Sequence, residues 1–275
     1  MARRDSSPDF IEAIARGLDV IKAFGPGQPV MSLASVAEAS NLPRPTARRI
    51  LITLEQLGYV RQADGSGYEL TPRVLDLGMS YVLSRGLWEI ARPHMESLVA
   101  RTRESSSIAQ LDGSDIVYVA RVAVPKIVAL VVTVGTRFPA MQTSLGKVLL
   151  AALPPDEAER VLAEPSRSGI TPRWQPDAAE RAAALREVRA RGWAITDGEL
   201  APAIRSVAAP LRDGDGRVIA ALNVNAHAAE TSLDTLTGHH LPLLLQTASA
   251  ISADWTACQS APQATSVPQV TTGES

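Results

Sequence analysis

Residues 44–53 carry side chains whose types and spacing suit contact with a nucleic acid. The segment reads RPTARRILIT, and its apolar positions repeat at the spacing of one buried helical stripe. Five polar side chains fall outside that stripe: Arg44, Thr46, Arg48, Arg49 and Thr53. Arginine bonds guanine edges and phosphates, and threonine reaches phosphates and thymine methyl groups. The pattern is typical of a helix that lies in the DNA major groove, with a solvated surface helix as the alternative.

A loop that leads into a helix, residues 135–147, has the features of an anion site. It reads GTRFPAMQTSLGK, and the free N–H groups and dipole at the start of a helix favour a carboxylate. An ordinary capped helix is the alternative, and the pattern alone favours that alternative. The candidate contacts in this segment are Arg137, Met141, Ser144, Leu145 and Gly146.

Two asparagines in the segment LNVNAH, residues 222–227, also point to a binding site. Asn223 and Asn225 alternate with Leu222 and Val224, so both asparagines lie on one face of the predicted strand. Two buried asparagines without partners would be costly. Either they line a polar cavity, or that face of the strand is in contact with water.

Two short helices and a hairpin are predicted around the arginine-rich segment. Ser32 is a good N-cap for the first helix, and Asn-Leu-Pro at 41–43 breaks the chain before the second. The turn residues DGSG at 64–67 predict a hairpin, the wing of a winged helix-turn-helix. We expect Ser32 and Arg61 to join the DNA contacts.

A further helix over residues 11–24 completes a three-helix core. Its end is marked by Gly-Pro-Gly, and one apolar face is expected to pack inward: Ile14, Leu18, Ile21 and Phe24. The winged helix-turn-helix domain is predicted to span residues 10–71. A linker helix is predicted within residues 72–86.

From residue 87 onward, β-rich runs alternate with helical patterns. Strands are expected at 107–111, 116–122, 127–134, 193–196, 204–211 and 218–225. Helices are expected at 87–102, 143–153, 155–162, 177–191 and 233–255, with a kink or late start at Pro93 in the first. Hairpins flanked by helices predict an α+β domain with an antiparallel sheet over residues 87–255. The polar stretch 256–275 is predicted to be a disordered tail.

Three segments of the N-terminal part resemble the IclR-type bacterial transcription regulators. They are ARGLDVIKAF, SLASVAEASNLPRPTARRILITLEQLGYV and YELTPRVLDLG. The resemblance implies a GAF/profilin-like effector-binding domain after the linker helix. It also implies a homodimer or homotetramer that binds a double-stranded DNA operator. Through the linker helix, a bound effector would change the spacing of the two recognition helices.

Three further segments resemble the subgroup that regulates aromatic-acid breakdown through the β-ketoadipate pathway: VLDLGMSYVLSRGLWEIARPHMESL, DGSDIVYVARV and ALNVNAHAAETS. That resemblance implies protocatechuate, 4-hydroxybenzoate or β-ketoadipate as effector. A regulator of another small-carboxylate pathway, responding to a keto acid, is the alternative. Together with the 135–147 segment, the effector contacts are then Thr196 or Asp197, Arg205, Ser206, Asn223, Asn225 and His227. Arg137 and Arg205 are the expected partners of a carboxylate, with surface ion pairing as their alternative role.

The length, charge and cysteine content of the chain argue against several other classes of protein. The chain has 275 residues, enough for two modest domains, and a net charge of −2, which does not suit a nonspecific nucleic-acid coat. The single cysteine, Cys258, excludes an internal disulfide. We expect a cytoplasmic protein, because neither a signal peptide nor an apolar run long enough to cross a membrane is evident.

Neither an enzyme nor a structural DNA-binding protein fits the sequence as well. The four histidines have no metal-ligand spacing, and SLGK at 144–147 lacks the first glycine of a P-loop. Asp197 and Glu199 could form an acid–base pair, but paired acids in a turn are usually solvated. We therefore expect no catalytic activity, no cofactor and no metal. A ligand-free architectural protein would not need the long C-terminal half.

Overall fold

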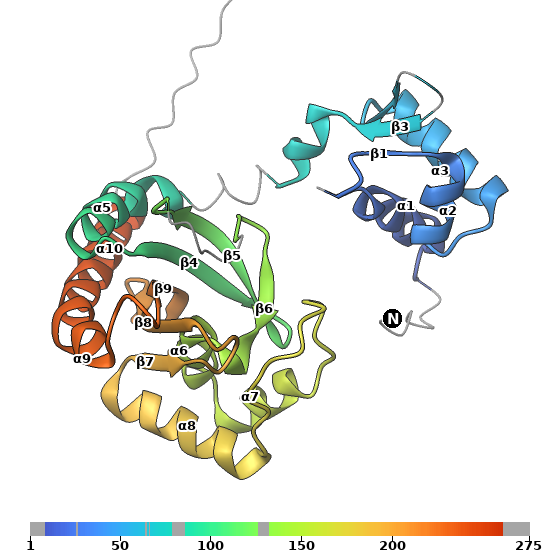
Figure 1. Ribbon diagram of the computed structural model, residues 1–275. Coiled ribbons are helices and arrows are strands. Elements are labelled where there is room, and N and C mark those ends of the chain that lie inside the picture. Colours follow the sequence, from blue (N-terminus) through green and yellow to red (C-terminus); the bar gives the residue numbers. More distant parts are fainter. Residues whose placement is uncertain are drawn as a thin grey trace, which may run out of the picture. The chain divides into compact units, whose positions relative to one another are not determined.

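Figure 1 shows the computed structural model of the protein, which describes residues 9–25, 27–63, 65, 67–78, 86–125 and 132–260. The chain divides into two compact units after residue 85, and each unit is described by itself. Within the described ranges, no helix is both long and apolar enough to cross a bilayer.

The N-terminal unit is a winged helix-turn-helix, as predicted. Its helices are α1 (Glu12–Ala23), α2 (Leu33–Ala39) and α3 (Arg44–Gln56). Its strands β1 (Val30–Met31), β2 (Val60–Ala63) and β3 (Gly67–Leu70) form an antiparallel sheet in the order β1-β3-β2. Ser32 caps α2 by accepting a hydrogen bond from the backbone N–H of Ser35 at 3.1 Å. Val20, Val36, Leu51 and Val60 meet in the core.

The apolar face of α1 differs from the prediction. Val20 and Phe24 enter the core, but Ile14 and Leu18 are 59% and 45% exposed. Ile11 is 61% exposed and lies on the same stripe, because positions 11, 14 and 18 follow helical spacing. The helix therefore has two apolar stripes, whereas the sequence analysis predicted a single buried one. Only one of the two is covered within the unit.

The predicted linker helix begins as expected. Pro72–Val74 forms a 3₁₀ turn (η1) whose start is capped by Thr71, and residues 75–78 continue in helical conformation. The remainder of the prediction, residues 79–85, lies outside the described residues.

The C-terminal unit is built on a six-stranded antiparallel sheet, so the predicted α+β fold is confirmed. The strand order is β6-β5-β4-β9-β8-β7. The strands are β4 (Ser105–Asp112), β5 (Asp115–Val122), β6 (Arg137–Pro139), β7 (Ala194–Asp197), β8 (Ile204–Arg212) and β9 (Val218–His227). Helices cover both faces of this sheet (Figure 1).

Each face of the sheet packs against its own set of helices. Alternate strand residues such as Ile108, Leu222 and Val224 pack against α5 (Leu87–Thr102) and α10 (Leu241–Ser260). The intervening residues, such as Ala208 and Ala221, pack against α6 (Ser144–Ala151), α7 (Pro155–Leu162) and α8 (Ala178–Arg191). The α6 face is the one that carries the predicted asparagine pair.

Two helices differ in detail from the predicted ones. Pro93 neither delays nor ends α5, which runs from Leu87 through it. A proline there removes one backbone hydrogen bond, to the carbonyl of the solvent-exposed residue Glu89. The final helix is divided into α9 (Leu233–Thr235), a π-helical turn (η3, Leu236–His240) and α10, which begins just before Pro242 and runs to Ser260.

The last helix thus passes the predicted boundary of the tail at residue 256, since Trp255 is buried and anchors it. Residues 261–275 lie outside the described residues. The same is true of residues 126–131 of the strand predicted over 127–134, and residues 132–134 are not in a strand. The short strand β6 was not predicted.

A close backbone contact joins α6 to the preceding 3₁₀ turn, η2 (Ala140–Gln142). A Cβ atom on Gly146 would fall well inside contact distance of the carbonyl oxygen of Ala140. Thr143 caps the helix there, because its hydroxyl accepts a hydrogen bond from the N–H of Gly146 at 3.0 Å. Glycine is required at this position so that the start of α6 can reach the sheet.

We expect Gly146→Ala to lower the free energy of unfolding by about 1–3 kcal/mol, because the added methyl group meets rigid backbone. Gly238→Ala is the matched control, since nothing lies near its added Cβ and the residue is exposed on a helical segment. That change should be neutral or stabilising by up to about 1 kcal/mol. Denaturant unfolding measures both, and equal effects of the two substitutions would contradict the close contact.

Candidate functional site

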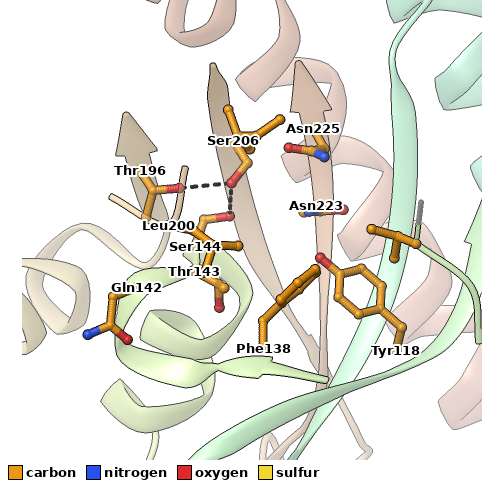
Figure 2. A pocket seen from close by; sticks show the side chains of 12 residues that line it. Tyr118, Phe138, Gln142, Thr143, Ser144, Thr196, Leu200, Ser206, Asn223 and Asn225 are labelled. Carbon is orange, nitrogen blue, oxygen red and sulfur yellow. Dashed lines mark hydrogen bonds between the residues drawn. The ribbon is translucent and has the colours of Figure 1, made fainter. Parts of the chain in front are cut away.

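A small cavity lies between the start of α6 and the sheet face that it covers (Figure 2). Its volume is about 20 Å³, room for about one water molecule. The wall combines aromatic, aliphatic and uncharged polar side chains: Tyr118, Val132, Phe138, Gln142, Thr143, Ser144, Thr196, Leu200, Ile204, Ser206, Asn223 and Asn225. None of these described lining residues is charged.

Three hydroxyl groups meet at one end of the cavity, as the dashed lines in Figure 2 show. Ser206 Oγ on β8 lies 2.7 Å from Ser144 Oγ on α6 and 2.9 Å from Thr196 Oγ1 on β7. Thr196 and Ser206 are directly paired across the strands, so their side chains share a face. Two hydrogen bonds use two of the three hydroxyl protons, which leaves one O–H to donate to a ligand.

The two asparagines line the same cavity, which resolves the alternatives left open by the sequence. Asn223 Oδ1 accepts a hydrogen bond from the backbone N–H of Ser107 at 2.9 Å. Its side-chain NH₂ group has no hydrogen-bond partner among the described residues. Asn225 pairs with Ser206 across the strands and so lies on the same face. The cavity therefore has amide groups beside the hydroxyl cluster.

Two aromatic rings form another wall of the cavity. The rings of Tyr118 on β5 and Phe138 on β6 pack edge to face, with their centroids 5.8 Å apart. Burial raises the pKa of Tyr118 to about 12, and the nearby positive charge of Arg121 opposes this shift. The Tyr118 hydroxyl is therefore protonated at neutral pH, and it can donate a hydrogen bond.

A partly buried ion pair holds the segment that brings Leu200 to the cavity. Lys147 Nζ on α6 lies 2.7 Å from Glu199 Oε1 and 4.8 Å from the ring centroid of Trp174. Trp174 also donates its backbone N–H to the carbonyl of Glu199 at 3.0 Å. Burial raises the pKa of Glu199, and the charge of Lys147 opposes that shift. The Glu199 carboxylate is thus part of a structural contact, not of a solvated acid pair.

The two arginines expected to bind a carboxylate lie away from the cavity. Arg137 forms an ion pair with Asp112, and Arg205 Nε lies 2.8 Å from Asp197 Oδ1. Arg137 precedes the cavity residue Phe138, and Arg205 precedes Ser206. Since successive strand residues point to opposite faces, both arginines face the other side of the sheet. Asp197 follows Thr196 and is turned away for the same reason.

Four other predicted effector contacts also lie outside the cavity wall. Met141 and Leu145 are buried in the core on the α6 side of the sheet. Gly146 packs against the backbone of Ala140, which leaves no room for a ligand there. His227 lies at the end of β9, where its Nδ1 accepts a hydrogen bond from the backbone N–H of Ala229 at 3.2 Å. Of the predicted set, the structure brings together Ser144, Ser206, Asn223 and Asn225, with Thr196 beside them.

Several cavity residues were not predicted, including Tyr118, Phe138, Leu200 and Ile204. One signal for Tyr118 was present in the sequence, because Tyr118 lies two residues after the core residue Ile116 and so on the same strand face. Leu200 lies in a short connecting segment and Phe138 in the three-residue strand β6, so neither has a periodicity long enough to mark it.

The predicted DNA-contacting residues lie on α3, the cap of α2 and the wing. Arg44, Arg48, Arg49 and Thr53 are exposed, and Thr46 is partly buried. Thr46, Arg49 and Thr53 line a groove between α3 and α1, opposite Glu12 and Arg16. Arg61 on β2 lies 2.6 Å from Glu69 on β3. Arg44 and Arg48 are one helical turn apart outside that groove, and neither forms an ion pair among the described residues.

Comparisons with known proteins agree with both units. The family model "IclR helix-turn-helix domain" matches residues 13–64, and the model "Bacterial transcriptional regulator IclR C-terminal" matches residues 79–253. The Pca regulon regulatory protein of Pseudomonas putida is 38% identical over 239 residues, covering 86% of this chain and 82% of that protein. The p-hydroxybenzoate hydroxylase transcriptional activator of Acinetobacter baylyi is 32% identical, covering 88% of this chain and 91% of that protein.

Solved structures show the same fold. A transcriptional regulator of Rhodococcus sp. RHA1 is 44% identical with a TM-score of 0.79, covering 90% of this chain and all of that one. An IclR homolog of Microbacterium hydrocarbonoxydans, crystallised with 4-hydroxybenzoate, is 24% identical with a TM-score of 0.77, covering 89% of this chain and 99% of that one. These relatives are named as regulators, not as enzymes. The chain belongs to the IclR family of bacterial transcriptional regulators.

Proposed function

We propose that the protein controls genes of aromatic-acid catabolism and that its effector is a hydroxylated aromatic acid of the 4-hydroxybenzoate or protocatechuate type. The observation that carries this proposal is the cavity wall, where two aromatic rings face a cluster of hydroxyl and amide groups. The names of the relatives from Pseudomonas putida and Acinetobacter baylyi support the same class of effector.

The cavity chemistry matches an aromatic effector better than a small keto acid. The edge-to-face rings of Tyr118 and Phe138 supply an apolar surface against which a benzene ring packs. The free hydroxyl proton of the Ser144–Ser206–Thr196 cluster and the NH₂ group of Asn223 supply hydrogen bonds to ring hydroxyls. A keto acid would leave the aromatic wall without a partner.

The cavity must widen to hold such an effector, because its present volume is that of about one water molecule. Binding therefore selects a conformation in which the wall has moved, and this difference is what links the effector to DNA affinity. Leu200 lies in a short connection between β7 and β8, tied to α6 by the Lys147–Glu199 ion pair. We expect this connection to be the part of the wall that moves.

The DNA-binding face consists of α3 and the wing, as the helix-turn-helix fold requires. Arg44 and Arg48 are the proposed contacts to base edges or phosphates, with Arg49, Thr46 and Thr53 on the neighbouring flank. Ser32 at the start of α2 and Arg61 on the wing are proposed to contact the phosphate backbone.

We further propose that the protein binds DNA as a homodimer, or as a tetramer of two dimers. The stripe of Ile11, Ile14 and Leu18 on α1 is apolar and exposed, which is unfavourable for a surface that only water covers. A second copy of the same stripe is a matched partner. Pairing two copies would place two α3 helices for the two halves of a palindromic operator.

Adding 4-hydroxybenzoate or protocatechuate should raise the melting temperature of the purified protein in a dose-dependent way, because binding to the folded state stabilises it. Pyruvate and glyoxylate serve as comparison ligands. Ser206→Ala should reduce the shift, since it removes the central hydroxyl of the cluster. Ser168→Ala, which changes a partly buried loop hydroxyl outside the cavity, is its control. A rise with the keto acids alone would contradict the proposed effector class.

Arg48→Ala should weaken operator binding by about 1–3 kcal/mol, because it removes a proposed contact of the recognition helix. Its effector affinity should stay unchanged. Arg186→Ala, an exposed arginine on α8 of the other unit, should alter neither property. Gel-shift titrations at fixed salt and effector titrations provide the two readouts. Loss of effector binding together with normal DNA binding in Arg48→Ala would refute the assignment of the two units.

A further inference from the structure

Arg121 is an arginine that the sequence analysis did not single out, and it lies on the cavity face of the sheet. It pairs with Ser107 across β5 and β4, and Ser107 in turn pairs with Asn223 across β4 and β9. Directly paired residues of antiparallel strands carry their side chains on the same face. Arg121, Ser107 and Asn223 therefore form one row, and Asn223 is part of the cavity wall.

The guanidinium group of Arg121 is directed along this row toward the cavity. Its Nη1 donates a hydrogen bond to Ser107 Oγ at 3.0 Å, and Ser107 is fully buried. The backbone N–H of the same serine donates to Asn223 Oδ1. The charge of Arg121 also acts on the hydroxyl of Tyr118, a second residue of the cavity wall.

Arg121 has no carboxylate partner among the described residues. Burial lowers the pKa of its guanidinium group. The other two arginines near the cavity strands differ from it, because Arg137 pairs with Asp112 and Arg205 pairs with Asp197. A partly buried guanidinium whose described contact is a neutral hydroxyl retains donors for an anion. The guanidinium group of Arg121, near Asn223 and Tyr118, can thus supply the positive charge that a carboxylate requires.

The distance from Arg121 to the hydroxyl cluster suits an aromatic acid. The guanidinium reaches back over β4, and Ser206 lies on β8, which is two strands away. Two strand spacings amount to about 10 Å. A benzene ring with a carboxylate at one end and a para hydroxyl at the other, with one hydrogen bond at each end, has a comparable length.

We propose that Arg121 is the residue that binds the effector carboxylate and so sets the preference for acids over neutral aromatic compounds. The inference rests on the proposed function. When the cavity opens, the carboxylate replaces the Ser107 hydroxyl as the acceptor of the guanidinium N–H groups. The ring then lies between Tyr118 and Asn223, and its hydroxyl group meets the cluster at Ser206.

The test compares 4-hydroxybenzoate with its neutral isostere 4-hydroxybenzamide on the full-length protein, by calorimetric titration. The unmodified protein should bind the acid at least about tenfold more tightly than the amide, because only the acid offers a charged acceptor for the hydrogen bonds of Arg121. Arg121→Gln should lose that preference by weakening the acid alone. Arg121→Lys keeps the charge without the planar fork and should retain part of the preference.

Arg137→Gln is the matched control, because Arg137 lies on the opposite face of the same sheet and should leave the preference intact. Unchanged acid affinity in Arg121→Gln would overturn the assignment of Arg121. An equal loss of acid and amide binding would do the same, since it would indicate a structural role. If the unmodified protein bound neither compound, the proposed effector class itself would be wrong. Melting curves of each variant establish that it is folded.

Discussion

The contact between the backbone of α6 and the carbonyl of Ala140 is the constraint on which the effector site depends. With glycine at 146, the helix approaches the preceding turn closely enough for Ser144 to reach Ser206 on the sheet. Thr143 satisfies the N–H of Gly146, so this group at the helix start has a partner without a ligand. Thr143, Ser144 and Gly146 lie within four residues of one another in the sequence. The geometry of this segment joins α6 to β8 and β7 through the hydroxyl cluster.

The cavity is small, apolar on one side and lined by uncharged side chains among the described residues, and this combination has an energetic consequence. An effector must displace packed side chains before it gains contacts, so part of its binding free energy is used to change the protein. In a regulator this is an advantage, because only that differential binding can shift a conformational equilibrium. The Lys147–Glu199 ion pair holds the Leu200 segment against α6 in the present conformation.

Strand alternation explains which of the predicted effector contacts lie in the cavity wall and which do not. Asn223 and Asn225 were placed on one face because they are two residues apart in a predicted strand. The structure puts both in the cavity wall. Arg137 and Arg205 were chosen for their charge, yet each is one residue away from a cavity position and so faces the opposite side. Phe138 and Leu200 approach the cavity through tertiary packing, which no local pattern encodes. For α1, two apolar stripes on one helix were read as a single buried face.

The hydroxyl cluster at Ser144, Ser206 and Thr196 has a property that fixed donors such as an arginine lack. Each hydroxyl can rotate, so the chain of hydrogen bonds can run in either direction without moving a heavy atom. The same three residues can therefore accept a hydrogen bond from a phenol hydroxyl or donate one to a carbonyl or carboxylate. Discrimination between differently substituted rings must then come from the shape of the opened cavity and from groups of fixed polarity around it. Such a site is suited to change its preferred compound in evolution by resizing its apolar wall, while the polar cluster stays as it is.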